Sequence, residues 1–303
     1  MIALHEERFS TVRDLLLTWW TEVRDARDEL PWRSERDPWR VLVAEMMLAQ
    51  TQAPRVAERY PAVIEQLSSP REAAALEPAR YLELWAGLGY YRRALFLRAS
   101  AIAICEHFDG VVPSALADLL TLPGVGPYTA RAVLAFAFEA SVGVLDTNIG
   151  RVLARAIAGR PLRAREAQEL ADALVPDTAA REWNLAVMDF GAIVCRSRSP
   201  LCADCPLNRA GWCRWRSDGG DDPATRSAGT SRAQARFSGS DRQGRGRLLK
   251  RALTGPITAI DLADASGWSA DPERAAMIAR RMVEDGLLST RADGAFVLAG
   301  REI

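Results

Sequence analysis

Apolar residues recur at spacings of three and four along most of the first 215 residues, and this period constrains the fold more than any other feature of the chain. It predicts a series of amphipathic helices with prolines such as Pro31, Pro113 and Pro161 at the boundaries between them. No alternating strand pattern interrupts the series, so we expect a mainly α domain over residues 1–216. The predicted helices are Phe9–Val23, Val41–Ala49, Ala75–Ala86, Arg92–His107, Tyr128–Phe138, Asn148–Ile157, Arg163–Leu174 and Asn184–Val194.

The pattern changes after this domain. Residues 217–245 are rich in Gly, Ser, Asp and Arg and have little apolar periodicity, which predicts a flexible basic linker. Residues 246–303 read as helices followed by a short hairpin, the order typical of a small winged-helix-like α+β domain. Such a domain either contacts DNA or only packs on the first domain. Its clearest predicted elements are Thr258–Ala265, Asp271–Glu284, Leu287–Thr290 and Ala295–Leu298.

Composition limits the class of protein. The 303 residues allow about two domains of roughly 150 residues each. No apolar run approaches the roughly 18 residues that a membrane-spanning helix needs, and the first ten residues lack the apolar core of a secretory signal, so we expect a cytoplasmic protein with no membrane contact. The net charge of zero does not by itself indicate nucleic-acid binding. Lys250 is the only lysine, which excludes a lysine nucleophile in the first domain.

Four of the five cysteines lie close together, with the spacing C-x6-C-x2-C-x7-C over residues 195–213. In a cytoplasmic protein such a cluster indicates a metal rather than disulfides. Four thiolates suit tetrahedral zinc or an iron–sulfur cluster, and the presence of a single close pair favours iron–sulfur. The predicted ligands are Cys195, Cys202, Cys205 and Cys213.

A glycine-rich turn, Leu122-Pro-Gly-Val-Gly-Pro127, joins two helical segments. Its two glycines allow a tight turn with exposed N–H groups, and the helix that follows begins at a proline, as helices often do. A helix N-terminus with free N–H groups attracts an anion, so this pattern suits a helix-hairpin-helix that holds a DNA phosphate. A plain helix–helix turn is the alternative.

Two carboxylates stand in unusual places. Glu45 lies within the apolar run Val41–Ala49, where burial would raise its pKa and keep it protonated as a candidate general acid. It could instead occupy the one solvent-exposed position of an amphipathic helix. Asp146 directly precedes a predicted helix, so it suits an N-cap that can also direct one oxygen at a ligand.

The run Gly87-Leu-Gly-Tyr-Tyr-Arg-Arg93 follows a helix end and combines flexible backbone, aromatic rings and arginines. This combination suits contact with a base displaced from its stack, although packing of the rings in the core is the alternative.

Together these motifs resemble the adenine DNA glycosylases, the MutY family of the endonuclease III-like helix-hairpin-helix superfamily, over roughly residues 12–216. The resemblance implies a monofunctional glycosylase with a 4Fe–4S cluster that acts on double-stranded DNA containing mismatched adenine, as a nucleoid-associated monomer. The matching sequence motifs are Leu30-Pro-Trp-Arg33, Ala44–Gln52, Gly87–Tyr91, Leu122–Ala130, Leu145-Asp-Thr-Asn-Ile149 and Met188-Asp-Phe-Gly-Ala192.

The resemblance also implies roles for individual residues. Glu45 would protonate N7 of an extruded adenine and handle the attacking water, Asp146 would stabilise the sugar cation, and Asn148 and Tyr128 would support them. Tyr128 stands where bifunctional relatives have a lysine, so no lysine-dependent lyase step is expected. Gln50 and Tyr90 would wedge into the duplex beside the mismatch. The expected DNA contacts are Arg33, Gln50, Thr51, Leu88, Tyr90, Gly124, Val125 and Gly126.

Three departures from the family pattern are present. Ala49 replaces the first glutamine of the family's L-Q-Q-T-Q word, the last cysteine gap is x7 rather than x5, and the usual C-terminal Nudix-like domain is not recognisable. The preference for 8-oxoguanine over guanine opposite the adenine therefore stays open. A thymine or uracil mismatch glycosylase of the same fold is the second reading. A non-catalytic iron–sulfur DNA-binding regulator is the third, and the presence of both carboxylates argues against it.

Overall fold

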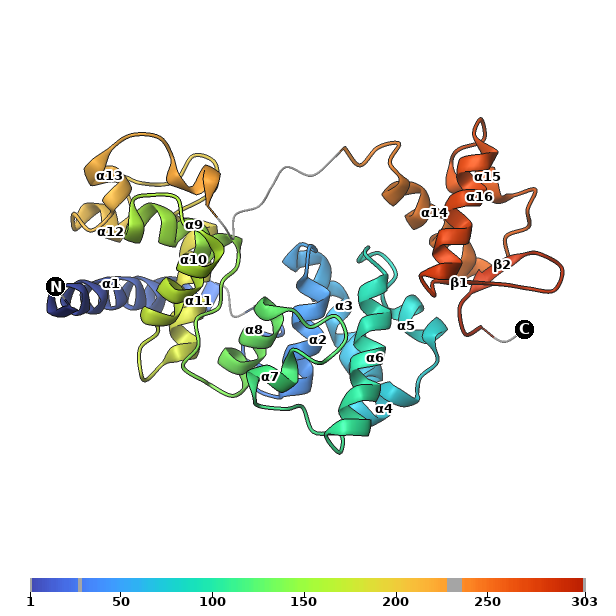
Figure 1. Ribbon diagram of the computed structural model, residues 1–303, viewed down its shortest axis with the longest axis horizontal. Coiled ribbons are helices and arrows are strands. Elements are labelled where there is room, and N and C mark those ends of the chain that lie inside the picture. Colours follow the sequence, from blue (N-terminus) through green and yellow to red (C-terminus); the bar gives the residue numbers. More distant parts are fainter. Residues whose placement is uncertain (1, 27–28, 228–235, 302–303) are drawn as a thin grey trace. The chain divides into compact units, whose positions relative to one another are not determined.

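The structure, a computed structural model, describes residues 2–26, 29–227 and 236–301 (Figure 1). Part of the expected linker, residues 228–235, lies outside the described residues. The chain forms two compact units, each assembled from separate stretches of sequence. Unit 1 comprises Met1–Val41, Ser114–Leu120 and Val125–Arg232, and unit 2 comprises Leu42–Pro113, Thr121–Gly124 and Ala233–Ile303.

Unit 1 is helical and is organised around α11 (Ala180–Ile193), against which both α1 and α9 pack. Ten residues of α11 are buried, and the ring of Phe190 meets Trp19 of α1 edge to face at 5.3 Å. This geometry lets the positive ring edge face the negative ring surface. The other helices of the unit are α1 (Ile2–Val23), η1 (Arg24–Ala26), α7 (Leu116–Leu119), α8 (Pro127–Ala137), α9 (Thr147–Val152), η2 (Leu153–Ala158), α10 (Ala164–Ala173), α12 (Pro206–Arg209), α13 (Arg214–Asp218) and η3 (Pro223–Arg226).

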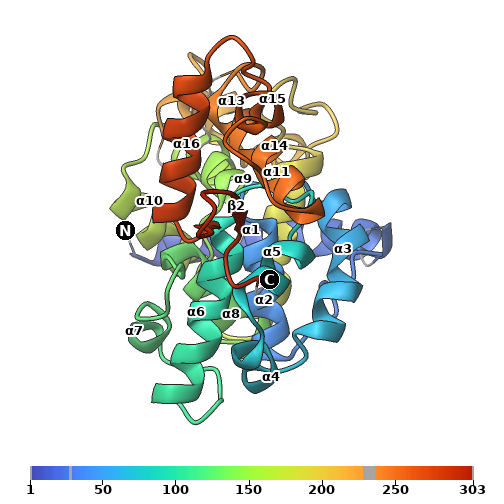
Figure 2. The same ribbon diagram turned by 90° about the vertical axis from the view of Figure 1, so that its right-hand side faces the viewer.

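Unit 2 contains the remaining helices and the two strands. Helix α4 packs along α6, and α14, α15 and α16 pack on one another near the hairpin (Figure 2). Strands β1 (Leu288–Thr290) and β2 (Phe296–Leu298) pair antiparallel, which confirms the predicted hairpin. The helices are α3 (Ala53–Gln66), α4 (Pro70–Ala75), α5 (Pro78–Leu84), α6 (Arg92–His107), α14 (Asp241–Thr254), α15 (Leu262–Ser266) and α16 (Pro272–Glu284). Helix α2 (Pro38–Leu48) begins in unit 1 and ends in unit 2.

The mainly helical fold is confirmed, but several boundaries differ from the predictions. The single helix predicted over Ala75–Ala86 is wrong: α4 ends at Ala75 and α5 begins at Pro78, because a proline disfavours helical backbone at the residue before it. The periodicity did not predict α3, which tolerates Pro61 in its interior. Helix α14 begins at Asp241, inside the expected linker. None of the helices in the described ranges combines the length and apolarity needed to cross a membrane.

Candidate active site

Glu45 lies in the middle of α2, a helix that is buried on all its faces. Residues 41–47 of this helix are all buried, and Glu45 itself is only 6% exposed. The structure therefore confirms the expected burial of the carboxyl. It excludes the alternative that Glu45 occupies the one solvent-exposed position of an amphipathic helix. A carboxyl held out of water in this way is suited to donating a proton.

Asp146 is the N-cap of α9, as its position before the helix predicts. Its Oδ1 accepts a hydrogen bond from the Ile149 N–H at 2.7 Å, and its Oδ2 accepts one from Asn148 Nδ2 at 2.9 Å. Burial raises the pKa of Asp146, and the hydrogen bonds from Ile149 and Asn148 oppose that rise without cancelling it. Both carboxylate oxygens thus have fixed directions.

Asn148 is positioned in turn by Arg151, one turn further along. Arg151 Nη2 donates to Asn148 Oδ1 at 2.8 Å and to the Gly191 carbonyl at 2.6 Å, and Arg151 Nε donates to the Cys195 carbonyl at 2.6 Å. A side chain at Gly191 would come within 2.7 Å of Asn148 Cβ, so the close approach of α11 requires glycine here. A continuous chain of hydrogen bonds thus joins Asp146 to the cysteine-containing segment in unit 1.

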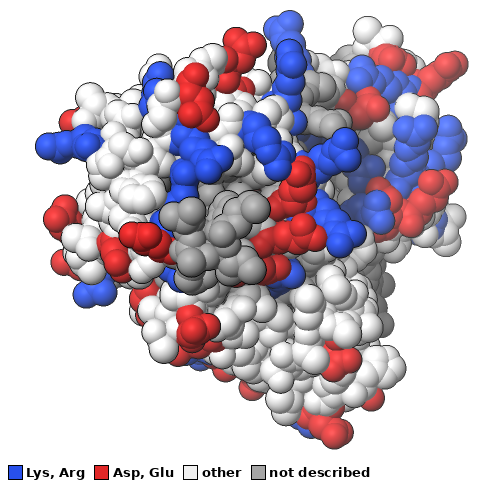
Figure 3. Space-filling model, turned by 60° about the vertical axis from the view of Figure 1, so that its left-hand side comes forward, with Lys and Arg blue, Asp and Glu red and all other residues white. Residues whose placement is uncertain are grey.

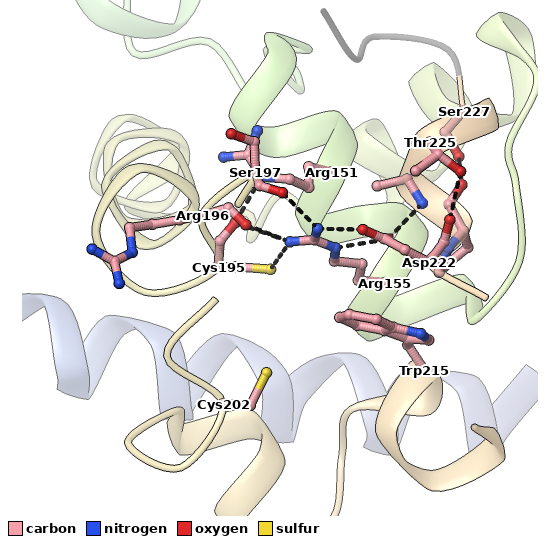
Figure 4. A network of polar contacts seen from close by, with 12 residues as sticks. Arg151, Arg155, Cys195, Arg196, Ser197, Cys202, Trp215, Asp222, Thr225 and Ser227 are labelled. Atoms are coloured by element: carbon pink, nitrogen blue, oxygen red, sulfur yellow. Dashed lines mark hydrogen bonds and ion pairs between the residues drawn. The ribbon is translucent and has the colours of Figure 1, made fainter. Parts of the chain in front are cut away.

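A second buried arginine, Arg155, anchors the residues after Cys195 (Figure 4). It is 2% exposed in the π-helical turn η2 and pairs with Asp222 at 2.5 Å. It also donates to the Arg196 carbonyl at 2.7 Å and to the Ser197 carbonyl at 3.3 Å, and its guanidinium lies 4.9 Å from the Trp215 ring. Sequence reasoning missed this arginine, although an arginine inside an apolar helical run is the same signal that pointed to Glu45.

The cysteine sulfurs accept hydrogen bonds from donors nearby. Cys202 Sγ accepts from Arg216 Nε at 3.1 Å and from Arg216 Nη2 at 3.0 Å, while Cys205 Sγ accepts from the Asn208 N–H at 3.4 Å. The Arg216 guanidinium also stacks 4.3 Å from the Trp215 ring. The hydrogen bond from Asn208 by itself favours the thiolate of Cys205 over its thiol.

Burial acts in the opposite direction on these thiols. It raises the pKa of Cys195 and Cys213, and it raises the pKa of Cys205 to about 11. Among the residues that the structure describes, no group of three or more His, Cys, Asp or Glu side chains is arranged to hold a metal ion. The predicted metal ligands therefore share one segment of unit 1, but the structure does not place them as a metal centre.

Two loops of unit 2 carry residues in strained backbone conformations. Gln50 and Tyr90 have φ values of 60° and 48°, in the left-handed region that non-glycine residues seldom adopt. Gly87 and Gly89, which precede Tyr90 in the same loop, have φ values of 90° and 72°. Both loops line the same cavity. Strain of this kind concentrates at functional sites, and here it falls on the two residues expected to enter the duplex.

Arg93 joins these two loops to the end of α2. Its Nη1 donates to the carbonyls of Met46 and Met47 at 2.7 and 2.8 Å, and its Nη2 donates to Thr51 Oγ1 at 2.8 Å. Thr51 Oγ1 in turn donates to the Leu88 carbonyl at 3.1 Å. Burial lowers the pKa of Arg93 to about 10. Because α2 also carries Glu45, this arginine fixes both loops relative to the candidate acid.

The glycine turn connects α7 and α8, as the predicted helix-hairpin-helix requires. Gly124 has a φ of 77°, and a Cβ there would lie 2.6 Å from Phe96 Cβ. Ser100 Oγ holds the turn by donating to the Pro123 carbonyl at 2.7 Å. Gly126 is the N-cap of α8 and supplies no side-chain cap. Val125 is buried, so the turn presents backbone rather than side chains.

Arg33 and Tyr128 are the remaining residues that the sequence predicts at the site. Arg33 is 9% exposed, and its Nη2 lies 2.5 Å from Asp189 Oδ1. Trp20 Nε1 donates to the other Asp189 oxygen at 3.1 Å, so Arg33 belongs to a buried ion pair rather than to a surface. Tyr128 lies half-buried in the first turn of α8.

Surface charge does not mark a binding face by itself. On the face drawn in Figure 3, basic and acidic side chains lie among one another instead of forming large areas of one sign. On this face, contacts with a polyanion would therefore come from local groups such as helix N-termini and individual arginines.

Residues 43–177 match the family described as HhH-GPD superfamily base excision DNA repair protein. The chain is 43% identical to the adenine DNA glycosylase of Mycolicibacterium smegmatis over 94% of this chain and 95% of that protein. It is 40% identical to the adenine DNA glycosylase of Mycobacterium tuberculosis over 94% of this chain and 92% of that protein. A solved thermostable thymine-DNA glycosylase is similar in structure, with a TM-score of 0.64 and 28% identity over 71% of this chain and 99% of its own.

Proposed function

This chain belongs to the adenine DNA glycosylase family of the HhH-GPD superfamily, and we propose that it hydrolyses the N-glycosidic bond of adenine opposite 8-oxoguanine or guanine in duplex DNA. The observation that carries this proposal is the burial of Glu45 on the helix that leads directly into the strained Gln50 loop. A buried carboxyl is thereby kept close along the chain to the residue proposed to open the duplex.

The proposed reaction uses the two carboxylates in different protonation states. Glu45 donates its proton to N7 of the extruded adenine, and the bond between C1′ and N9 breaks with its electron pair going to the base. The ionised carboxylate of Asp146 stabilises the positive charge that develops on the sugar. Water then adds to C1′ and gives a proton to the Glu45 carboxylate, which leaves an abasic site. Asn148 and Tyr128 support these two residues.

We propose that the enzyme has no lysine-dependent lyase activity. A Schiff base with the sugar needs an amine nucleophile. The position that carries lysine in bifunctional relatives is Tyr128, and the only lysine is Lys250 in the C-terminal part of the chain.

DNA contact is proposed to come mostly from backbone and aromatic groups. The backbone N–H groups of Gly124, Val125 and Gly126, in the turn that leads into the N-terminus of α8, would bind a phosphate without reading sequence. The strained Gln50 and Tyr90 would enter the stack. Thr51 and Leu88, which are hydrogen-bonded to each other, would hold the two loops together around the duplex. The proposed active form is a monomer.

We further propose that Cys195, Cys202, Cys205 and Cys213 hold a 4Fe–4S cluster. The donor set fits, because four thiols lie in one segment and N–H donors already point at three of the sulfurs. Since burial raises the pKa of three of the thiols, loading must release protons. The cluster would supply a rigid cross-link for the segment that Arg151 and Arg155 hold. A brown protein containing iron and sulfide is expected, whereas a colourless protein containing zinc contradicts this assignment.

A panel of mismatches tests the proposed function. Single-turnover assays on duplexes containing A·8-oxoguanine, A·G, T·G and U·G should show release of adenine only. Glu45→Gln should abolish base release and retain duplex binding, while Glu58→Gln, the same change at an exposed position of α3, should behave as the wild type. Release of thymine without adenine would support the second reading, which the similarity to a thymine-DNA glycosylase structure favours. Binding without any base release would support the regulator.

A further inference from the structure

One arginine of the cysteine-containing segment bonds to a sulfur through two of its nitrogens. Arg216 Nε and Arg216 Nη2 donate to Cys202 Sγ at 3.1 and 3.0 Å. The two residues are 14 positions apart in the chain, so the contact ties helix α13 back to the loop that contains Cys202. Because a guanidinium is planar and rigid, donation through two of its N–H groups fixes its orientation as well as its position.

The ring of Trp215 supports this guanidinium from one side. The Arg216 guanidinium lies 4.3 Å from the centre of the ring, and Trp215 Nε1 donates to the Gly220 carbonyl at 3.3 Å. The guanidinium of Arg155 lies 4.9 Å from the centre of the same ring (Figure 4), and its Nη1 donates to Cys195 Sγ at 3.7 Å. One indole ring therefore supports two arginines that contact the sulfurs of two different predicted ligands.

The two arginines differ in the charge that they bring to the sulfurs. Arg155 pairs with Asp222 at 2.5 Å, so a carboxylate offsets its positive charge. In the part of the chain that the structure describes, no carboxylate forms an ion pair with Arg216. Its side chain is exposed, but contacts of 3.0 and 3.1 Å leave no room for water between the guanidinium and the sulfur. Arg216 thus brings positive charge directly to Cys202.

We propose that Arg216 sets the reduction potential of the 4Fe–4S cluster by donating two hydrogen bonds to the Cys202 sulfur, and that Trp215 positions it for this task. The inference rests on the proposed function, which assigns the cluster to this segment. Reduction adds one electron, and the negative charge on the ligand sulfurs increases. N–H donors and positive charge at a sulfur therefore stabilise the reduced state more than the oxidised state, which raises the potential.

A spectroelectrochemical titration of the full-length protein with its cluster tests this assignment, and the electrode supplies the electron. Arg216→Met removes the charge and both donors but keeps a long side chain against the ring. It should shift the ratio of oxidised to reduced cluster about 10-fold towards the oxidised state, the scale of one charge-assisted hydrogen bond. For a one-electron couple this shift corresponds to a potential lower by about 59 mV. Arg216→Lys keeps the charge without the planar fork, so it should lower the potential by a smaller amount.

Trp215→Leu tests the positioning role. It should lower the potential in the wild-type background and have no further effect when combined with Arg216→Met, because the ring acts through the guanidinium. A further drop in the double variant would show that Trp215 does not act through Arg216.

Arg209→Met is the matched control, since it removes an exposed arginine of the same segment that, within the described ranges, donates to no cysteine sulfur. It should leave the potential unchanged. Equal shifts in Arg209→Met and Arg216→Met would reveal a general effect of charge and overturn the proposal, as would an unchanged potential in Arg216→Met. If Arg216→Met fails to retain iron and sulfide, an unchanged potential in Arg216→Lys overturns the proposal in its place. A wild-type protein without iron and sulfide would contradict the cluster assignment instead.

Discussion

Gln50→Gly should make the protein more stable and less active at the same time. Gln50 is exposed and has a φ of 60°, so replacing it loses little buried surface and removes a left-handed side chain. Holding a non-glycine residue in that region costs about 1–2 kcal/mol. The greater freedom of glycine in the unfolded chain offsets about 0.5–1 kcal/mol of the relief. The net expectation is a gain of about 0.5–1 kcal/mol.

The assay pairs Gln50→Gly with Gln50→Ala. Both variants lack the side chain that is proposed to enter the duplex, but alanine keeps the strain. The glycine variant should therefore melt about 1–4 °C above the alanine variant, on the scale expected for domains of this size. Both should lose single-turnover adenine release to a similar degree.

Two results would refute the reasoning. If Gln50→Gly melts no higher than Gln50→Ala, the left-handed backbone of this loop stores no strain. If either variant releases adenine at the wild-type rate, the side chain of Gln50 does not enter the duplex, and the backbone strain in this loop has no role in the reaction.

Three further perturbations follow from particular contacts. Arg155→Met removes the cation that pairs with Asp222 and leaves that carboxylate without its ion-pair partner. It should lower the free energy of unfolding by about 3 kcal/mol, measured by urea denaturation. Asp146→Asn should abolish base release and keep the cap on the Ile149 N–H, but its amide nitrogen cannot accept the hydrogen bond from Asn148. Because burial raises the folded-state pKa of Asp146, the wild type loses stability as pH rises through that pKa, so the wild type should gain stability relative to the variant on acidification from pH 7.5. Gly124→Ala places a Cβ 2.6 Å from Phe96 Cβ and should weaken binding to matched and mismatched duplexes equally, as fluorescence anisotropy would show.

Local sequence patterns predicted most of the features that depend on residues close together in the chain. The spacing of three and four predicted most of the helices, although not α3. Asp146 was expected as a cap and is one, and the predicted hairpin consists of two paired strands. The exceptions have local causes too. Pro78 divides a run whose apolar spacing continues through it, so hydrophobic periodicity alone misplaced the boundary.

Features that depend on distant partners were not predictable. The spacing of apolar residues contains no information on whether Gln50 adopts a positive φ, and it does not predict that Arg93, 42 residues further along the chain, donates to the side chain of the adjacent Thr51. The link from Asn148 through Arg151 to the Cys195 carbonyl spans 44 residues between its last two members. The Arg242 contact with Tyr90 spans 152 residues. Each needs the folded chain to bring its members together.

Arg92 and Arg93 show why a count of arginines cannot identify a DNA-binding protein. They are adjacent in a run that suggested contact with a displaced base, yet burial gives them different tasks. Arg93 is sequestered against carbonyls, and desolvation lowers its pKa to about 10, so it holds loops in place and is not available to a phosphate. Arg92 lies over the Phe96 ring and 3.5 Å from Asp285, where salt and ligands can compete for it. In a chain with zero net charge, affinity for DNA must come from the few arginines of the second kind together with backbone donors. Replacing Arg92 should therefore reduce the salt dependence of binding, whereas replacing Arg93 should disturb both loops at any salt concentration.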